Sequence, residues 1–235
     1  MKRSYKEEYQ YWLDSPALGE EEWKELSAIA DDDKEIESRF YAPLEFGTAG
    51  LRGIMATGLN RMNIHVIRWA TQAFAAVIKA EGDEACRKGV VVCYDCRLNS
   101  EKFAREAAGV MAANGIRVRI FDALRPTPEL SFAVLHYGAT AGINITASHN
   151  PKEYNGYKVY GPDGCQITLE TADAVSKHIG AADHFDGVRL CGFADALADG
   201  TICMIGEDCL EAFLDAVERL SLIHISEPTR HAQIS

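Results

Sequence analysis

Residues 141–151 read AGINITASHNP, an apolar run that ends in small polar residues and a proline. The run is short and β-prone, and Ser, Asn and Pro are good turn formers, so we predict a strand followed by a tight loop. Ser148, with His149 beside it, lies on that loop. Open α/β sheets bind ligands at the carboxyl ends of their strands, which makes the loop a candidate site. The alternative is an ordinary Asx- or ST-turn that ends a strand.

Strand-like and helix-like segments alternate on both sides of this stretch. Strands are predicted at 90–94, 117–121, 142–145 and 157–160, and helices at 63–80, 100–114, 127–137 and 168–179. Single helices between strands imply right-handed crossovers and parallel neighbours. We therefore predict a three-layer α/β/α domain whose sheet is mainly parallel but mixed.

The rest of the chain divides around this domain. We expect an N-terminal helical extension at 1–40, the α/β/α domain at 41–200, the start of a linker or second domain at 201–220, and a tail at 221–235. The extension has two amphipathic helical patterns. A glycine-punctuated loop at 47–53 lets the backbone approach a neighbour closely. The tail lacks a continuing helical period and resembles translated sequencing-adapter sequence, so we treat it as non-native.

Composition limits the classes of partner. The chain has 235 residues, 47% of them hydrophobic, and a formal net charge of -11. That charge repels nucleic-acid backbones and anionic lipid, so we expect neither partner. The sequence has no apolar leader pattern and no run of eighteen apolar residues, so we expect a cytoplasmic protein.

Seven cysteines in such a chain indicate reduced thiols. Cys93 and Cys96 form a lone C-x-x-C motif just before a predicted helix, which leaves a redox pair as a minor alternative. A structural zinc site is less favoured, because no second pair of Cys or His ligands accompanies the motif.

Four segments resemble, in order, the motifs of the α-D-phosphohexomutases, the family of phosphoglucomutase and phosphomannomutase. They are FGTAGLRG at 46–53, YDCRLNS at 94–100, RPTP at 125–128, and TASHNP at 146–151 with its extension YNGYK at 154–158. The first segment resembles the phosphoglucomutase and phosphopentomutase branch in particular. The resemblance covers about residues 1–220 and implies an N-terminal fragment, since this is the first of four domains in the family.

The resemblance also implies roles for individual residues. Ser148 would carry a transferable phosphoryl group, and Arg52 would bind its oxygens with a fixed fork of donors. Lys158, ten residues after Ser148, would act at the reacting oxygen as acid or base or as an electrostatic stabiliser. The alternatives are a surface arginine that caps a loop and a solvated lysine on a short strand.

The neighbours of these residues are expected to support them. His149 would orient the phosphoserine or relay a proton, since imidazole titrates near neutrality. Asn150 would fix the loop, with a further contact to phosphate or substrate. Asp95 and Arg97 would pair on a strand-to-helix turn and brace the serine loop from behind.

The resemblance implies one Mg²⁺ in the intact enzyme, with a sugar 1,6-bisphosphate as activator and intermediate. Ser148 would contact the metal through its phosphoryl group. The family's aspartate loop, Asp-Gly-Asp-x-Asp-Arg, does not occur in this sequence, and Asp183 and Asp186 do not reproduce it. We therefore expect the metal site to be incomplete in this chain.

The function expected of the intact protein is that of a phosphoglucomutase-like enzyme, which interconverts sugar 1- and 6-phosphates and has a small phosphosugar as its partner. Phosphopentomutase and phosphomannomutase activities are alternatives, as is a catalytically inactive phosphosugar-binding module for this chain alone. A serine hydrolase is less favoured, because Ser148 and His149 are adjacent in sequence and no Gly-x-Ser-x-Gly elbow occurs. Sugar specificity and oligomeric state stay open.

Overall fold

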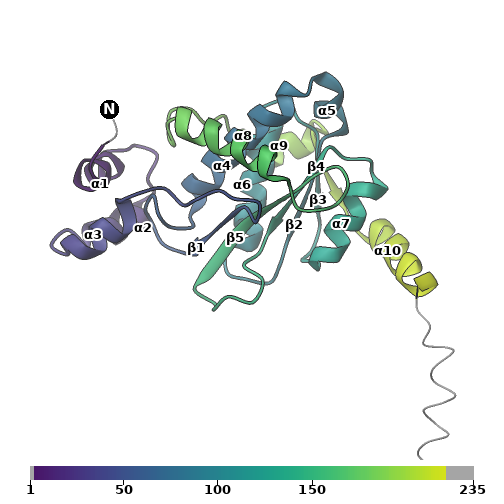
Figure 1. The fold of residues 1–235 in the computed structure, drawn as a ribbon, viewed down its shortest axis with the longest axis horizontal. Coiled ribbons are helices and arrows are strands. Elements are labelled where there is room, and N and C mark those ends of the chain that lie inside the picture. The colour runs from purple at the N-terminus through teal and green to yellow at the C-terminus, as the bar shows by residue number, and fades with distance from the viewer. Residues whose placement is uncertain (1–2, 221–235) are drawn as a thin grey trace, which may run out of the picture.

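The computed structural model describes residues 3–220, and the predicted tail at 221–235 lies outside the described residues (Figure 1). Within that range six strands form one sheet: β1 (Leu51–Ile54), β2 (Val90–Tyr94), β3 (Val118–Phe121), β4 (Ala141–Ile145), β5 (Tyr154–Tyr160) and β6 (Ile202–Ile205). Their order is β1-β5-β4-β2-β3-β6. The strands β4, β2, β3 and β6 run parallel, whereas β5 is antiparallel to both β4 and β1. The predicted mainly parallel, mixed sheet is confirmed.

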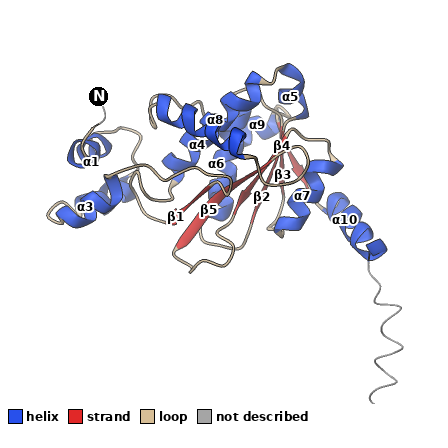
Figure 2. Ribbon diagram, in the orientation of Figure 1, coloured by secondary structure: helices blue, strands red, loops and turns tan. Residues whose placement is uncertain are grey.

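Ten helices accompany the sheet among residues 3–220. They are α1 (Tyr5–Leu13), α2 (Glu20–Ser27), α3 (Asp33–Phe40), α4 (Ile64–Ala80), α5 (Asp83–Lys88), α6 (Ser100–Ala113), α7 (Thr127–His136), α8 (Leu169–Ala181), α9 (Phe193–Ala198) and α10 (Glu207–Leu220). Figure 2 shows helices on both sides of the strands. No helix in this range is long and apolar enough to cross a membrane.

The sheet divides the interior into two apolar cores. The larger core contains side chains of α4, α6 and α8 together with one face of the sheet, and it includes Val92, Ile143 and Tyr157. The smaller core lies on the opposite face under α7 and α10, and it includes Cys93 and Leu130. Every residue of β2 and β4 is buried, as expected for central strands covered on both faces. The predicted three-layer architecture is therefore confirmed.

Local sequence signals explain several element boundaries. Asn63 caps α4, because its side-chain oxygen accepts a hydrogen bond from the Val66 backbone N–H at 3.0 Å. Gly50 has a positive φ of 75°, and a Cβ atom there would collide with the Tyr157 carbonyl of β5. The close backbone approach expected of the loop at 47–53 is therefore an approach to the neighbouring strand.

Some elements differ from the sequence-based expectation. The extension has three helices rather than two, because Asp32 starts α3 by accepting a hydrogen bond from the Glu35 N–H. Residues 51–53 belong to a strand and not to a loop, since β1 is held by pairing with the distant strand β5. β5 begins at Tyr154, earlier than predicted, and the short helices α5 and α9 were not predicted.

The sheet also extends past the domain boundary predicted at residue 200. β6 pairs with β3 in parallel, with Val118 opposite Ile202 and Phe121 opposite Ile205. Residues 202–205 are therefore a strand of the main sheet rather than part of a linker.

The N-terminal extension packs on the domain through aromatic side chains. The Trp12 ring lies 5.0–5.7 Å from the rings of Phe40, His65, His184 and Phe185. A polar contact adds to this packing, because the Glu25 carboxylate accepts a hydrogen bond from the Thr57 hydroxyl at 2.6 Å. The extension therefore stabilises the segment between β1 and α4.

We predict that Trp12→Ala destabilises the domain. Trp12 is 0% exposed, and removal of a buried aromatic side chain costs about 3–5 kcal/mol of unfolding free energy. Chemical denaturation measures this loss. Trp23→Ala is the matched control, because Trp23 is 50% exposed. Equal stability losses in the two variants would contradict the packing of the extension on the domain.

Candidate functional site

Ser148 lies on the loop between β4 and β5, at the carboxyl edge of the sheet. Its φ is 56°, in the left-handed region that non-glycine residues rarely adopt. Its backbone N–H donates to the Thr146 hydroxyl at 3.0 Å, and the Asn150 N–H donates to the Ala147 carbonyl at 3.1 Å. The side chain is exposed. A strained turn that presents a hydroxyl to solvent is typical of a functional site.

The guanidinium of Arg97 holds this loop by its backbone. Its N–H groups donate to four carbonyl oxygens at 2.7–3.1 Å, those of Ser148, Asn150, Pro151 and Tyr154. No neutral side chain could supply such a set of donors. The contact to the Ser148 carbonyl bears directly on the residue with the strained backbone.

Asp95 in turn fixes Arg97. Its carboxylate accepts a hydrogen bond from the Arg97 backbone N–H at 3.0 Å and lies 3.5 Å from the guanidinium Nε. It also accepts from the Ser100 hydroxyl at 2.8 Å. Asp95 and Arg97 therefore lie together behind the serine loop, and neither points to solvent as a free charge.

Asn155 is a further residue of this framework, although its place in the sequence alone predicted no role for it. It is fully buried, and its amide donates at 3.0 Å to the Leu98 carbonyl and to the Ser100 hydroxyl. Its Oδ1 accepts from the Gly156 N–H at 2.8 Å. Asn155 thus ties β5 to the loop after β2. Its position inside the YNG segment was the signal that could have indicated it.

Arg52 approaches the loop from β1. Its Nη1 donates to the Asn150 Oδ1 at 2.9 Å, and its side chain is exposed. Asn150 is therefore held twice, by Arg52 through its side chain and by Arg97 through its carbonyl. The remaining donors of Arg52 face solvent beside Ser148's loop.

Lys158 lies on β5 on the same face of the sheet as Arg52. Arg52 is opposite Gly156 in the antiparallel pair, and Gly156 and Lys158 are two residues apart, so their side-chain directions coincide. Partial burial, and next the nearby Arg52 charge, lower the pKa of Lys158 from its ordinary value of 10.5, while Asp95 opposes the shift. A lowered pKa increases the fraction of neutral amine, the form that accepts a proton.

His149 is exposed, and its Nδ1 lies 3.4 Å from the Ser148 Oγ. This separation exceeds the roughly 2.6–3.2 Å that is typical of a nucleophile and its base. Among residues 3–220, no carboxylate hydrogen-bonds to His149 to orient its ring. The arrangement does not form the triad that a serine hydrolase uses.

The described residues do not complete a magnesium site. Within residues 3–220 there is no group of three or more His, Cys, Asp or Glu side chains that could hold a metal ion. Ser148 offers one oxygen, and the nearby Asp95 carboxylate is engaged by Arg97 and Ser100. Asp183, in the segment after α8, accepts a hydrogen bond from the Tyr11 hydroxyl. An ion at Ser148 needs oxygen ligands beyond this set.

The C-x-x-C motif is not arranged for redox chemistry. Cys93 is buried on the α7 side of the sheet, and burial raises the pKa of its thiol to about 12. Cys96 is exposed, and both cysteines are free. A buried thiol that stays protonated is a poor nucleophile, so the two residues act as separate cysteines.

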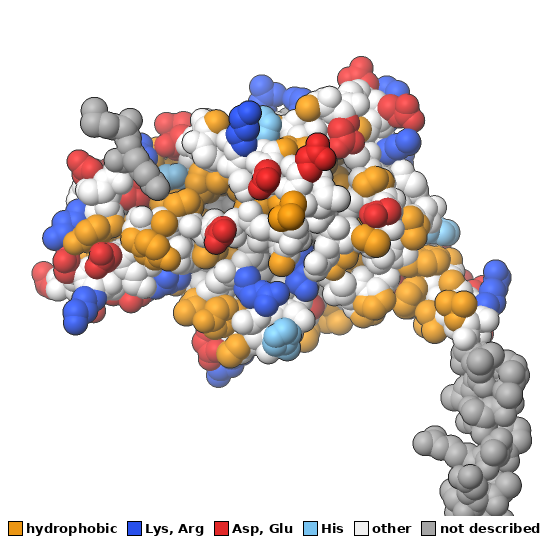
Figure 3. Space-filling view, in the orientation of Figure 1, with side chains coloured by type: hydrophobic (Ala, Val, Ile, Leu, Met, Phe, Trp, Pro, Cys, Tyr) orange, Lys and Arg blue, Asp and Glu red, His pale blue; other side chains and the backbone are white. Residues whose placement is uncertain are grey.

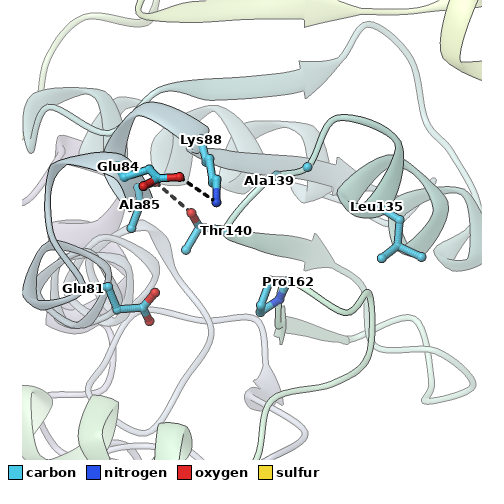
Figure 4. Close-up of a pocket in the computed structure, with 9 residues that line it drawn as sticks. Glu81, Glu84, Ala85, Lys88, Leu135, Ala139, Thr140 and Pro162 are labelled. Atoms are coloured by element: carbon cyan, nitrogen blue, oxygen red, sulfur yellow. Dashed lines mark hydrogen bonds and ion pairs between the residues drawn. The ribbon is translucent and has the colours of Figure 1, made fainter.

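A cavity of about 490 Å³ lies at the opposite edge of the sheet (Figure 4). Thr140, Lys88 and Pro162 are among the residues that line it. Lys88 pairs with Glu84 at 3.1 Å, and the Thr140 hydroxyl donates to the Ala85 carbonyl. Thr140 precedes β4, whereas Ser148 follows it, so the length of a five-residue strand, about 16 Å, separates the two places.

The charge at the carboxyl edge of the sheet, which carries Ser148, differs from the net charge of the whole chain. The net charge is -11, yet Arg52, Arg97 and Lys158 come together at this edge, with the acidic Asp95 beside them. In the space-filling view, lysine and arginine side chains gather beside a histidine in the lower middle (Figure 3). Such a local cationic edge suits a phosphorylated ligand.

Comparisons with known proteins show which sequences this chain is similar to. The family model for "Phosphoglucomutase/phosphomannomutase, alpha/beta/alpha domain I" matches residues 43–185. The chain is 36% identical over 188 residues to a phosphoglucomutase of Staphylococcus saprophyticus, covering 80% of this chain and 34% of that protein. It is 41% identical over 177 residues to human phosphopentomutase, covering 72% and 29%.

Two solved structures are similar in fold to this chain. A Thermus thermophilus protein assigned to the phosphomannomutases superposes with a TM-score of 0.53 at 35% identity, over 59% of this chain and 30% of that one. A Burkholderia thailandensis phosphoglucomutase/phosphomannomutase family protein, at 24% identity and a TM-score of 0.51, supports the fold alone. The chain spans about a third of the length of the relatives that it matches.

We predict that Arg97→Lys loosens the serine loop while the domain stays folded. Lysine keeps the charge but lacks the fork, and each lost hydrogen bond to a charged group costs about 1.5–3 kcal/mol. Amide exchange at Asn150 and Tyr154 should therefore accelerate by roughly tenfold or more. Arg105→Lys, at an exposed pair with Glu101 on α6, is the control. Unchanged protection of the loop in Arg97→Lys would show that the guanidinium does not hold it.

Proposed function

Because the chain belongs to the phosphoglucomutase/phosphomannomutase family, we propose that Ser148 carries a transferable phosphoryl group in a phosphosugar mutase. The observation that carries this proposal is the presentation of Ser148. Its hydroxyl is exposed on a left-handed turn that Arg97 holds from behind, and Arg52 and Lys158 lie on the same edge.

Arg52 is proposed to bind the phosphoryl oxygens. One of its N–H groups engages Asn150, which fixes the guanidinium beside the serine loop. The other donors then have a defined direction, and a planar fork matches phosphate oxygens in pairs. Asn150 contributes by holding Arg52 and the loop in one arrangement.

Lys158 and His149 are proposed to act as the groups that accept and donate protons during the transfer. As the phosphorus–oxygen bond to Ser148 breaks and a bond to the sugar hydroxyl forms, the neutral Lys158 amine accepts the hydroxyl proton. His149, whose Nδ1 lies 3.4 Å from the Ser148 Oγ, returns a proton to the departing serine oxygen. Transfer of the other phosphoryl group from the bisphosphate reverses both steps, so the serine and the protons are restored.

The net reaction is the interconversion of a sugar 1-phosphate and a 6-phosphate through a 1,6-bisphosphate that reorients. Phosphopentomutase and phosphomannomutase reactions are the alternatives within the same chemistry. Bound Mg²⁺ would neutralise charge on the transferred group. Because the described residues lack a full ligand set for it, we assign the complete reaction to a protein of the relatives' length. We assign this chain the role of a phosphorylatable domain that binds phosphosugar.

Phosphorylation of the chain tests the role of Ser148. We expect that incubation with glucose 1,6-bisphosphate and Mg²⁺ adds one phosphoryl group to the peptide that contains Ser148, as detected by mass spectrometry. Ser148→Ala should abolish the modification, and Ser15→Ala, at a partly exposed serine of the extension, should not. Equal labelling of Ser148→Ala and the unmodified chain would refute the proposal. If no labelling occurs in any variant, the chain alone is a binding module and Ser148 is not its phosphoryl carrier.

The pH dependence of the same transfer tests Lys158. Because the pKa of Lys158 lies below 10.5, the neutral amine that takes up the hydroxyl proton accumulates as pH rises through that lowered pKa. The single-turnover rate of transfer from phosphorylated Ser148 to glucose 1-phosphate should therefore rise with pH in the same range. Lys158→Met should remove this rise and slow transfer by about 10²–10⁴-fold. Lys177→Met, at an exposed lysine of α8, should keep both the rate and the profile.

A further inference from the structure

Asn144 is a polar residue inside a central strand. It lies in β4, is 1% exposed, and occupies a register position otherwise given to the small apolar core under α7. Its Nδ2 donates to the Thr127 hydroxyl at 2.9 Å, at the start of α7. Its Oδ1 is buried and has no hydrogen-bond partner among the described residues.

An unpartnered buried acceptor is costly. Leaving such a group unsatisfied in the interior is unfavourable, and an apolar side chain at this position would avoid the cost. The other residues of β4 are Ala, Gly and Ile. The Thr127 contact explains one end of the amide but leaves the oxygen at the other end without a structural role.

Lys158 is the residue directly opposite Asn144. The two are Cα partners in the antiparallel pair of β4 and β5. Directly opposite residues project from the same face, with Cβ atoms about 4.5–5.5 Å apart. Lys158 is a long polar side chain on that face, and it is partly buried. Arg52 on β1 and Asp95 after β2 are the charged groups that act on it, and α7 presents Thr127 to Asn144.

We propose that Asn144 is a positioning residue, whose Oδ1 accepts an N–H of the Lys158 amine and holds that amine toward the edge that carries Ser148. The amide oxygen accepts from the amine in both of its protonation states, since even the neutral amine keeps two N–H groups. Thr127 binds the other end of the amide and fixes which way the oxygen points. One N–H of Lys158 is then fixed, and its lone pair or remaining protons face the reacting oxygens.

This inference rests on the proposed function of Lys158, but it is tested without any sugar phosphate. The 235-residue chain is acetylated by trace acetic anhydride over a range of pH, and mass spectrometry of the Lys158 peptide gives the pKa and reactivity of its amine. We expect Asn144→Leu, which removes the acceptor and keeps the branched shape of the side chain, to lower the pKa of Lys158 by about one unit, a tenfold rise in the ratio of neutral to charged amine. Asn144→Asp, which adds a negative charge at the same place, should raise it.

The matched control is Asn114→Leu. Asn114 is also buried and bonds to Gln72, but it lies at the end of α6 on the other face of the sheet, so its loss should leave the Lys158 titration unchanged. If Asn144→Leu does not fold, Asn144→Ala replaces it.

A Lys158 titration that is the same in the unmodified chain and in folded Asn144→Leu or Asn144→Ala would overturn the inference. Failure of Ser148 to become phosphorylated would instead count against the proposed function alone, because the acetylation measurement does not depend on it.

Discussion

The guanidinium of Arg97 is the contact on which the rest of the site depends. The loop after β4 has few backbone partners of its own, and it places Ser148 in a left-handed conformation that costs free energy. Arg97 offsets that cost with charge-assisted hydrogen bonds to four loop carbonyls, which is more than any other side chain could reach at once. Asp95 holds Arg97 from the other side, and the Ser100 hydroxyl at the start of α6 in turn binds Asp95, so the loop is fixed to the junction between β2 and α6.

The sheet topology decides which groups share this edge with Ser148. The parallel strands bring the ends of β2 and β4 together, as in other open α/β sheets. β5 then runs antiparallel along the open side of β4, away from this edge, and β1 pairs with β5, so that Lys158 and Arg52 lie near the same edge. A fully parallel sheet would have placed a helical crossover there instead. The mixed topology is thus a condition for two cations to lie beside one serine.

The sequence predicted the elements whose formation depends on residues close together in the chain. Buried apolar runs identified β2 and β4, and the turn-forming residues around Ser148 identified the loop. It could not predict β1, whose four residues are a strand only because β5 pairs with them from about a hundred residues away in the chain. The role of Asn155 could not be predicted for the same reason, because the fold brings its partners Leu98 and Ser100 to it.

Two buried asparagines, Asn144 and Asn155, contribute to the site through the hydrogen-bonding groups of their amides and not through charge. Asn155 has every part of its amide engaged, so its role ends with fixing the backbone. Asn144 is equally buried but has one end free, on the face where Lys158 projects. Both amides cost desolvation free energy that an apolar residue would not. The fully hydrogen-bonded amide of Asn155 offsets this cost by fixing the backbone. The unpartnered oxygen of Asn144 lies on the face to which Lys158 projects, and we propose that it offsets the cost by fixing the direction of the Lys158 amine.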